Sequence, residues 1–356
     1  MDIIIPSPKT EEELPNYEIL EFYRGDDTHT DLTIQCYDMR FHITVSVTNI
    51  QDDVSTTKEY MSLLRKLDSE DSTGVVEEEN ESDEGDAMEN ICFWIAAKCN
   101  SAMRVLSSRK EKTQVQTLHD WFHTKTVTLV LRARDGKLCV CSSSSIYQQD
   151  FAPMVTLSPA VYALDIPSIE ASNIAILLDE TDEENLPRRQ KKVSVGSNTI
   201  RFYKPTYTSE QANREITSLI HIKSTNRSNT IRTPTLHELV KNPENNASIS
   251  GILLEYIPHH NTLADIDLDN TPVSIRVKWK DQLQSMIHSL HSAGIVWGDA
   301  KPDNVLVDVD DNLWIIDFGG RITEGWVDGG KADSRERDLQ ALSKIIEILD
   351  PTGLAM

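Results

Sequence analysis

The stretch Trp297-Gly298-Asp299-Ala300-Lys301-Pro302-Asp303-Asn304, together with Asp317-Phe318-Gly319 further along the chain, decides the fold. The first stretch is a charged loop between an apolar helical segment and an apolar strand, where packing alone would favour apolar side chains. Within six residues it brings together a carboxylate, an ammonium group and an amide. The second stretch follows the next predicted hairpin, so we expect its carboxylate to lie beside the first loop.

These groups match the chemical needs of phosphoryl transfer from ATP. One carboxylate orients the attacking hydroxyl group and accepts its proton, while a cation offsets the charge of the moving phosphoryl group. A second carboxylate and an amide oxygen hold Mg²⁺ against the phosphates. The residue types are therefore those that phosphoryl transfer from ATP with Mg²⁺ requires.

The pattern Asp-x-Lys-Pro-x-Asn, followed by two short strands and Asp-Phe-Gly, resembles the protein-kinase superfamily. The resemblance implies that Asp299 and Lys301 are catalytic, as the carboxylate of the catalytic loop and the lysine two residues after it. It implies that Asn304 and Asp317 bind Mg²⁺. Further along, Asp338 resembles the helical residue that braces this loop.

Upstream residues extend the resemblance. Lys204 ends a predicted strand, and Glu215 follows it by 11 residues on a predicted helix. In the kinase pattern these two residues form an ion pair, and the lysine holds the α- and β-phosphates of ATP. The stretch Leu254-Glu255-Tyr256-Ile257 resembles the hinge whose backbone meets adenine, which implies that Glu255 and Ile257 bind the nucleotide.

The sequence departs from the kinase pattern in four places, one of which is that residues 1–150 match no module that we can name. Trp297-Gly298 stands where the family has His-Arg, which removes the usual partner of an activation-loop phosphate. No G-x-G-x-x-G precedes the predicted strand at 193–195, and acidic residues at 179–184 occupy that region. No Ala-Pro-Glu follows Asp317, and 37 residues remain after Gly319, so we expect an abbreviated helical lobe.

We expect an α+β protein with two domains. Residues 160–356 should form a bilobal protein-kinase-like fold, with a small β-rich lobe and the abbreviated helical lobe. Residues 1–155 should form a mixed α/β N-terminal domain, with hairpins at 32–47 and 127–141; Asp135-Gly136 in the second favours a type I′ turn. The whole resembles divergent Ser/Thr kinase-like proteins that are common in filamentous fungi.

An acidic segment at 68–89 interrupts the N-terminal domain between two helical patterns at 60–67 and 88–106. It contains 11 Asp and Glu residues and no Lys or Arg. Such a composition buries too little apolar surface to offset the entropy lost on ordering. We therefore expect a disordered insertion.

Composition narrows the classes of partner. The formal net charge of −22 argues against general binding of nucleic acid or of an anionic membrane, because both need a basic surface. No apolar run approaches the roughly 20 residues of a membrane span, and no basic, apolar start indicates a signal peptide. Five cysteines without a C-x-x-C pair make a zinc site unexpected. We expect an intracellular protein, cytoplasmic or nuclear.

The sequence is compatible with three functions. Lys301 and Pro302 favour a Ser/Thr-type protein kinase, whose acceptor is a protein hydroxyl group. Gly298-Asp299 and the missing peptide-binding lobe favour a small-molecule kinase of the aminoglycoside or choline type. The missing Gly-rich loop favours a pseudokinase that acts as a binding module. The identity of the acceptor and the oligomeric state do not follow from the sequence.

Overall fold

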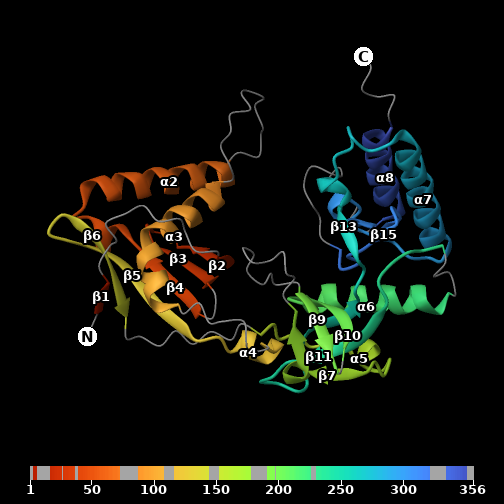
Figure 1. Cartoon of the computed structure of the whole chain (residues 1–356), viewed down its shortest axis with the longest axis horizontal. Helices are drawn as coiled ribbons and strands as arrows, with labels where there is room; N and C mark the ends of the chain where they lie inside the picture. The colour runs from red at the N-terminus through yellow and green to blue at the C-terminus, as the bar shows by residue number, and fades with distance from the viewer. Residues whose placement is uncertain are drawn as a thin grey trace, which may run out of the picture. The chain divides into compact units, whose positions relative to one another are not determined.

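The computed structural model describes residues 3–5, 17–25, 27–36, 39–72, 87–107, 116–143, 152–177, 191–196, 198–225, 230–320 and 334–350. These residues form an α+β protein that divides into two compact units, shown in Figure 1. Unit 1 contains the described residues of 1–116 and 120–151. Unit 2 contains residues 117–119 and 152–177 and the described residues from 191 onward. None of the described helices is both long and apolar enough to cross a bilayer.

A six-stranded sheet forms the centre of unit 1. Both hairpins expected in this unit are confirmed, because β3 pairs with β4 and β5 pairs with β6, each antiparallel. Asp135 and Gly136 both have positive φ, as a type I′ turn requires. The strand order is β1-β6-β5-β4-β3-β2, with β1 (Ile3–Ile5), β2 (Glu18–Arg24), β3 (Thr30–Cys36), β4 (Met39–Val45), β5 (Thr126–Arg134) and β6 (Lys137–Ser143).

The two central strands β4 and β5 run parallel, which requires a long crossover connection. The helices of unit 1 supply that connection, and α2 and α3 lie together over the sheet in Figure 1. Alternate apolar residues of β3 and β4 pack with the buried face of α3 in one core. These helices are α1 (Val47–Ile50), α2 (Val54–Ser72) and α3 (Ala87–Leu106), and the short helix α4 (Leu118–Phe122) has residues in each unit.

The expected disorder of 68–89 is wrong at both ends of that segment. Helix α2 continues to Ser72, because a helix already nucleated over buried side chains adds further turns at little cost. Helix α3 begins at Ala87 and carries Glu89 in its first turn, where the helix dipole favours a carboxylate. Residues 73–86 lie outside the described part of the chain.

A second six-stranded sheet forms the first half of unit 2, in the order β7-β11-β12-β10-β9-β8. Helix α6 (Ser209–Ser224) follows β10, and Thr208 caps its N-terminus with a side chain that accepts a hydrogen bond from the Gln211 N–H. The strands are β7 (Ser168–Glu170), β8 (Ile174–Ile176), β9 (Lys191–Val195), β10 (Thr199–Pro205), β11 (Leu236–Lys241) and β12 (Ile249–Glu255), with a short helix α5 (Pro159–Tyr162) before them.

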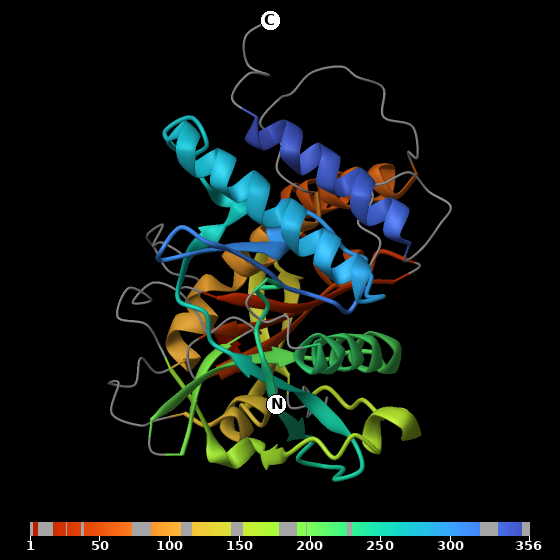
Figure 2. The same cartoon turned by 90° about the vertical axis from the view of Figure 1, so that its right-hand side faces the viewer.

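Helices dominate the second half of unit 2. Helix α7 (Val273–Ser292) buries the apolar face expected from its sequence and ends just before Gly294, whose φ is +79°. Helix α8 (Arg335–Leu349) lies alongside α7 in both Figure 1 and Figure 2. A small antiparallel sheet joins β13 (His259–Thr262), β14 (Val305–Asp308) and β15 (Leu313–Ile315), and single 3-10 turns occur at Ala171–Asn173, Leu263–Asp265 and Pro302–Asn304.

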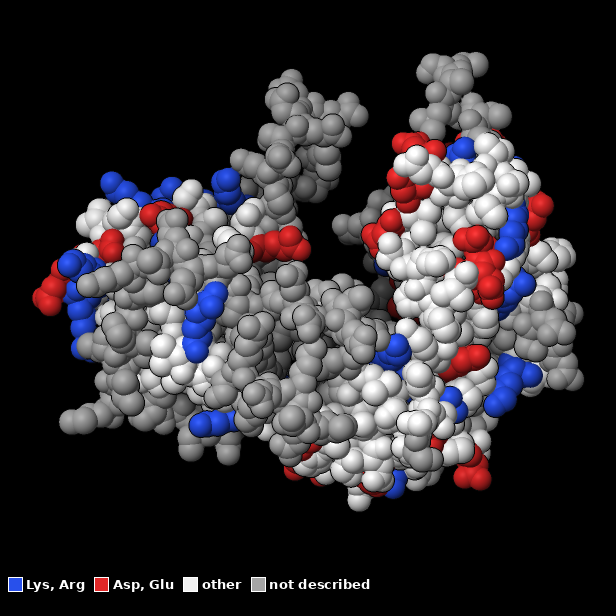
Figure 3. Space-filling model, viewed as in Figure 1, with Lys and Arg blue, Asp and Glu red and all other residues white. Residues whose placement is uncertain are grey.

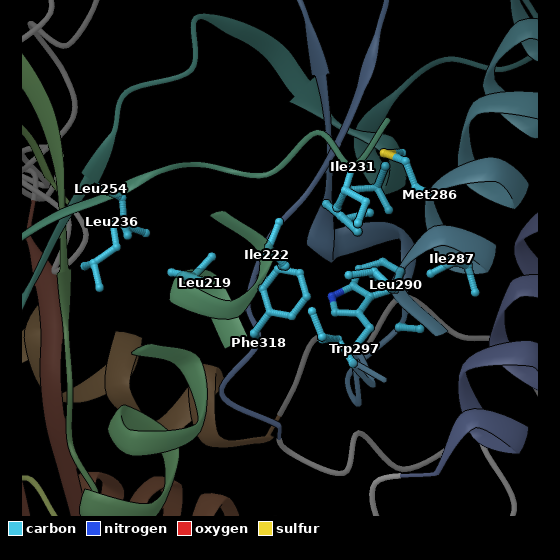
Figure 4. Close-up of a cluster of buried hydrophobic side chains, with 14 of the residues drawn as sticks. Leu219, Ile222, Ile231, Leu236, Leu254, Met286, Ile287, Leu290, Trp297 and Phe318 are labelled. Atoms are coloured by element: carbon cyan, nitrogen blue, oxygen red, sulfur yellow. The ribbon is translucent and has the colours of Figure 1, made fainter. Parts of the chain in front are cut away.

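One hydrophobic core joins the two halves of unit 2. It takes side chains from α6 and β12 on one side and from α7 and α8 on the other. Figure 4 shows the ring of Phe318 between Ile222 of α6 and the indole of Trp297, with Leu290 of α7 beyond it. The Asp-Phe-Gly stretch is therefore fixed at the centre of this core by its phenylalanine.

Candidate active site

The loop at 297–304 begins with a buried tryptophan. The Trp297 side chain is 1 % exposed, and its indole Nε1 donates a hydrogen bond of 2.8 Å to the Ile316 carbonyl. This bond ties the start of the loop to the end of β15, immediately before Asp317. The apolar core thus sets the position of the loop, and the polar side chains that follow Trp297 project from a rigid base.

Asp338 holds the loop from the side of α8. Its two carboxylate oxygens accept hydrogen bonds of 2.8 Å from the backbone N–H groups of Trp297 and Gly298. His291 of α7 lies 2.9 Å from the same carboxylate. Gly298 has φ +89°, a left-handed conformation that favours glycine. The carboxylate and the glycine together fix the turn that leads into Asp299.

Asp299, Lys301 and Asn304 form one contact group. The Asn304 amide nitrogen donates to the Asp299 backbone carbonyl at 2.8 Å and to its carboxylate at 2.9 Å. Lys301 Nζ lies 3.3 Å from the same carboxylate, which is 8 % exposed. Because two acceptors identify the Asn304 nitrogen, the amide oxygen must point away from Asp299.

The hairpin of β14 and β15 brings Asp317 next to Asn304. Asn304 immediately precedes β14, Asp317 follows shortly after β15, and the Ile316 N–H donates to the Asn304 carbonyl at 3.0 Å. Asp317 has φ +61°, which costs free energy for a residue with a side chain. Its Oδ1 accepts a hydrogen bond of 3.2 Å from the Gly319 N–H. The strained backbone places this carboxylate where it meets other charged groups.

The Lys204 side chain extends from β10 and contacts both Asp317 and Glu215. Its Nζ lies 2.6 Å from Glu215 Oε1 and 3.0 Å from Asp317 Oδ1. Glu215 is on the buried face of α6. Gly251 of β12 lies so close to the Lys204 backbone that a side chain there would overlap it. One ammonium group therefore contacts two carboxylates that come from different elements.

The electrostatics of this triad depend on burial and on the neighbouring charges. Burial alone would lower the pKa of Lys204, but the Glu215 and Asp317 carboxylates outweigh it, so that this pKa is raised. Burial raises the pKa of Glu215, and Lys204 opposes that rise. Burial would also raise the pKa of Asp317, but Lys204, the Gly319 N–H and Lys301 together lower it. The two contact groups adjoin, because the residue before Asp317, Ile316, donates to the carbonyl of Asn304, which itself contacts Asp299.

Asn304 and Asp317 fit a magnesium ion. Mg²⁺ prefers oxygen ligands, and in proteins it takes one or two carboxylates together with phosphate oxygens and water. The amide oxygen of Asn304 and the carboxylate of Asp317, whose pKa is lowered, would supply such ligands. Two carboxylates against the single Lys204 ammonium leave an excess of negative charge that a cation can offset. In the described ranges no group of three or more His, Cys, Asp or Glu could hold a metal, but a Mg²⁺ that also binds phosphates needs none.

The proposed hinge residues, Glu255 and Ile257, lie at the end of β12 and just after it, and β12 pairs with the strand of Lys204. In the antiparallel register of β10 and β12, Lys204 lies opposite Ile252 and Arg201 lies opposite Glu255. The Glu255 side chain accepts a hydrogen bond of 3.2 Å from the Thr235 N–H, so its carboxylate is used within the sheet. The Ile257 carbonyl lies 2.7 Å from His259 Nδ1. No backbone hydrogen bond between described residues uses the Ile257 N–H.

The structure adds residues that sequence reasoning missed. His291 supports Asp338, and Arg214, which directly precedes Glu215, donates a long hydrogen bond of 3.5 Å from Nη2 to the Trp297 carbonyl. A histidine near the end of one helix and an arginine on another belong to no sequence motif.

On the face of unit 2 shown in Figure 3, Asp and Glu lie in several groups with Lys and Arg between them.

Comparison with known proteins gives short similarities to kinases. No family model matches the chain. A segment of 67 residues, 18 % of this chain, is 39 % identical to serine/threonine-protein kinase MRCK gamma of Homo sapiens. A segment of 49 residues, 14 % of this chain, is 43 % identical to serine/threonine-protein kinase PKH3 of Eremothecium gossypii. The matches span 4 % and 7 % of these relatives' lengths, so they suggest a kinase-like relationship over a short region.

Proposed function

We propose that unit 2 is a phosphotransferase of protein-kinase type, which moves the γ-phosphoryl group of ATP, bound with Mg²⁺, to a hydroxyl group of a protein Ser or Thr. The observation that carries this proposal is the contact of Lys204 with both Glu215 and Asp317 beside the group of Asp299, Lys301 and Asn304. The two short similarities to Ser/Thr kinases support it.

On the nucleotide side, Lys204 is the residue that would bind the phosphates. Glu215 and Asp317 keep its ammonium group charged and hold it in one place. Asn304 and Asp317 would hold Mg²⁺, which neutralises the charge of the phosphates and of the group in transfer. The backbone at Glu255 and Ile257 would meet the base, with the Ile257 N–H as its donor.

On the acceptor side, Asp299 would orient the hydroxyl group and take its proton. Its carboxylate is held by the amide nitrogen of Asn304, so it cannot turn away from the site. Lys301, at 3.3 Å from that carboxylate, would offset charge on the group in transfer. Lys301-Pro302 favours a protein acceptor over a small molecule.

Transfer of labelled phosphate by the full chain tests this proposal. With Mg·ATP and a mixture of dephosphorylated casein and basic peptides as acceptors, we expect transfer by the wild type. Asp299→Asn should reduce it roughly 100-fold or more, because a positioned general base is lost. Asp303→Asn is the matched control, since it makes the same change in the same loop at an exposed side chain.

Each other outcome points to a different function. Binding of Mg·ATP without transfer to any protein, but with transfer to aminoglycosides or choline, would replace the protein acceptor by a small molecule. No binding of Mg·ATP at millimolar concentration would remove the enzymatic proposals and leave a pseudokinase that acts as a binding module. Equal activity of wild type and Asp299→Asn would overturn the role of Asp299.

A further inference from the structure

Helix α6 contributes two neighbouring side chains to two different parts of the site. Glu215 contacts Lys204 of β10, whereas the Arg214 guanidinium donates from Nη2 to the Trp297 carbonyl at 3.5 Å. Trp297 starts the loop that carries Asp299. The same helix therefore touches the residues assigned to the nucleotide and the loop assigned to the acceptor.

Gly320 gives a second, independent observation on the Arg214 side chain. The guanidinium lies so close to the Gly320 backbone that a methyl group at this position would overlap it. Gly320 also has φ +65°, which disfavours any other residue. Arg214 therefore packs against the backbone directly after Asp317-Phe318-Gly319 as well as against the start of the loop at 297–304.

Both backbone groups of Trp297, its N–H and its carbonyl, thus form hydrogen bonds with side chains of neighbouring helices. Asp338 of α8 accepts from its N–H, and Arg214 of α6 donates to its carbonyl. The next residue, Gly298, also donates its N–H to the Asp338 carboxylate. A guanidinium group suits this place because it is planar, permanently charged and has five N–H donors, so it can bind a carbonyl and still pack flat against a backbone.

We propose that Arg214 is a positioning residue that couples the Lys204–Glu215 pair to the loop carrying Asp299. This inference rests on the proposed function of unit 2 and extends it to the way the site is assembled. A shift of α6 that separates Glu215 from Lys204 also withdraws Arg214 from Trp297 and Gly320. The position of α6 therefore affects both the nucleotide half and the acceptor half of the site.

Kinetics of Arg214→Met test the coupling. The contacts among Lys204, Glu215 and Asp317 do not involve Arg214, so we expect the KM for ATP to stay within about threefold, whereas kcat falls roughly 10- to 100-fold through a misplaced loop. Arg214→Lys, which keeps the charge but loses the planar fork, should recover part of kcat. Lys223→Met, on the exposed face of the same helix, is the matched control and should leave both parameters unchanged.

Two further measurements need no activity, so they separate this inference from the proposed function. Amide hydrogen exchange of the full chain should show faster exchange at 297–304 in Arg214→Met than in Lys223→Met. In a double-mutant cycle of Arg214→Met with Gly320→Ala, the loss of melting temperature should be smaller than the sum of the single losses, since the overlap with the guanidinium is removed. Unchanged exchange at 297–304, or additive losses in the cycle, would overturn the coupling even if the wild type transfers phosphate.

Discussion

The ammonium group of Lys204 lies 2.6 Å from the carboxylate of Glu215, although one residue is on a strand and the other on the following helix. The pair is shielded from water, with 15 % and 5 % of the two side chains exposed. A buried ion pair adds little net stability by itself, because desolvation of both charges is costly. Removal of one partner, however, leaves the other charge buried and unpaired. This asymmetry makes the pair testable.

Lys204→Met should lower the free energy of unfolding by about 3 kcal/mol at neutral pH. The substitution leaves Glu215 facing Asp317 without a cation, so the pKa of Glu215, already raised by burial, rises further. A carboxyl group whose pKa is raised by folding destabilises the fold above its ordinary pKa, and the penalty disappears as the group becomes protonated. The deficit should therefore shrink as the pH falls, which urea unfolding at several pH values measures.

Lys241→Met is the control for that series. Lys241 also forms an ion pair, at 2.8 Å from Glu170. Both of these side chains are more than a third exposed, at 35 % and 43 %. Loss of such a surface pair should cost less than about 1 kcal/mol and should not depend strongly on pH. If the two variants behave alike, the Lys204 pair is not buried as described.

Asp338→Ala should destabilise unit 2 by roughly 2–4 kcal/mol. The carboxylate is 1 % exposed and accepts from the N–H groups of Trp297 and Gly298, so its removal leaves the buried Trp297 N–H without this acceptor. Asp281→Ala, at an exposed position of α7, is the control and should have little effect. Thermal unfolding measures both variants. A melting temperature of Asp338→Ala within about 1 °C of the wild type would contradict the bracing role.

Asp317→Ala should be less stable than Asp317→Asn by about 1 kcal/mol in the absence of nucleotide. Both variants remove the same charge, but the backbone at this position has φ +61°, a region in which Asn is far more frequent than Ala. Chemical unfolding of the two proteins in one buffer gives the difference directly. Equal stabilities would show that the left-handed backbone at 317 relaxes without cost.

Local patterns predicted much of the fold. The Asp135-Gly136 turn identified its hairpin because both residues accept positive φ. The spacing of Trp279, Leu283 and Leu290 identified α7, whose side chains at these positions are buried. The parallel pairing of β4 with β5 could not be predicted, since nothing local specifies which distant strands meet. The acidic end of α2 was predicted to be disordered but is helical to Ser72, because extending an existing helix costs little free energy even where the composition is acidic.

In the candidate site, too, some residues could be identified from the sequence, whereas their contacts could not. Asp299 and Asp317 could be found because carboxylates in charged loops fit phosphoryl transfer, whereas Lys204 was found through the resemblance to the kinase pattern. Their contact geometry, in which one ammonium group serves two carboxylates, is a property of the tertiary structure. Arg214 could not be found, because a single arginine on a helix is ordinary until its carbonyl partner is known.

Calorimetric titration of Mg·ATP into the full chain tests the proposed nucleotide site most directly. We expect the wild type to bind Mg·ATP and to bind ATP more weakly when EDTA removes the metal. Asp317→Asn should weaken binding of Mg·ATP at least about tenfold, because it removes a metal ligand, whereas Asp299→Asn should keep the affinity within a few-fold. Equal affinities of wild type and Asp317→Asn, or no binding by the wild type at millimolar Mg·ATP, would contradict a metal-nucleotide site at Lys204, Asn304 and Asp317.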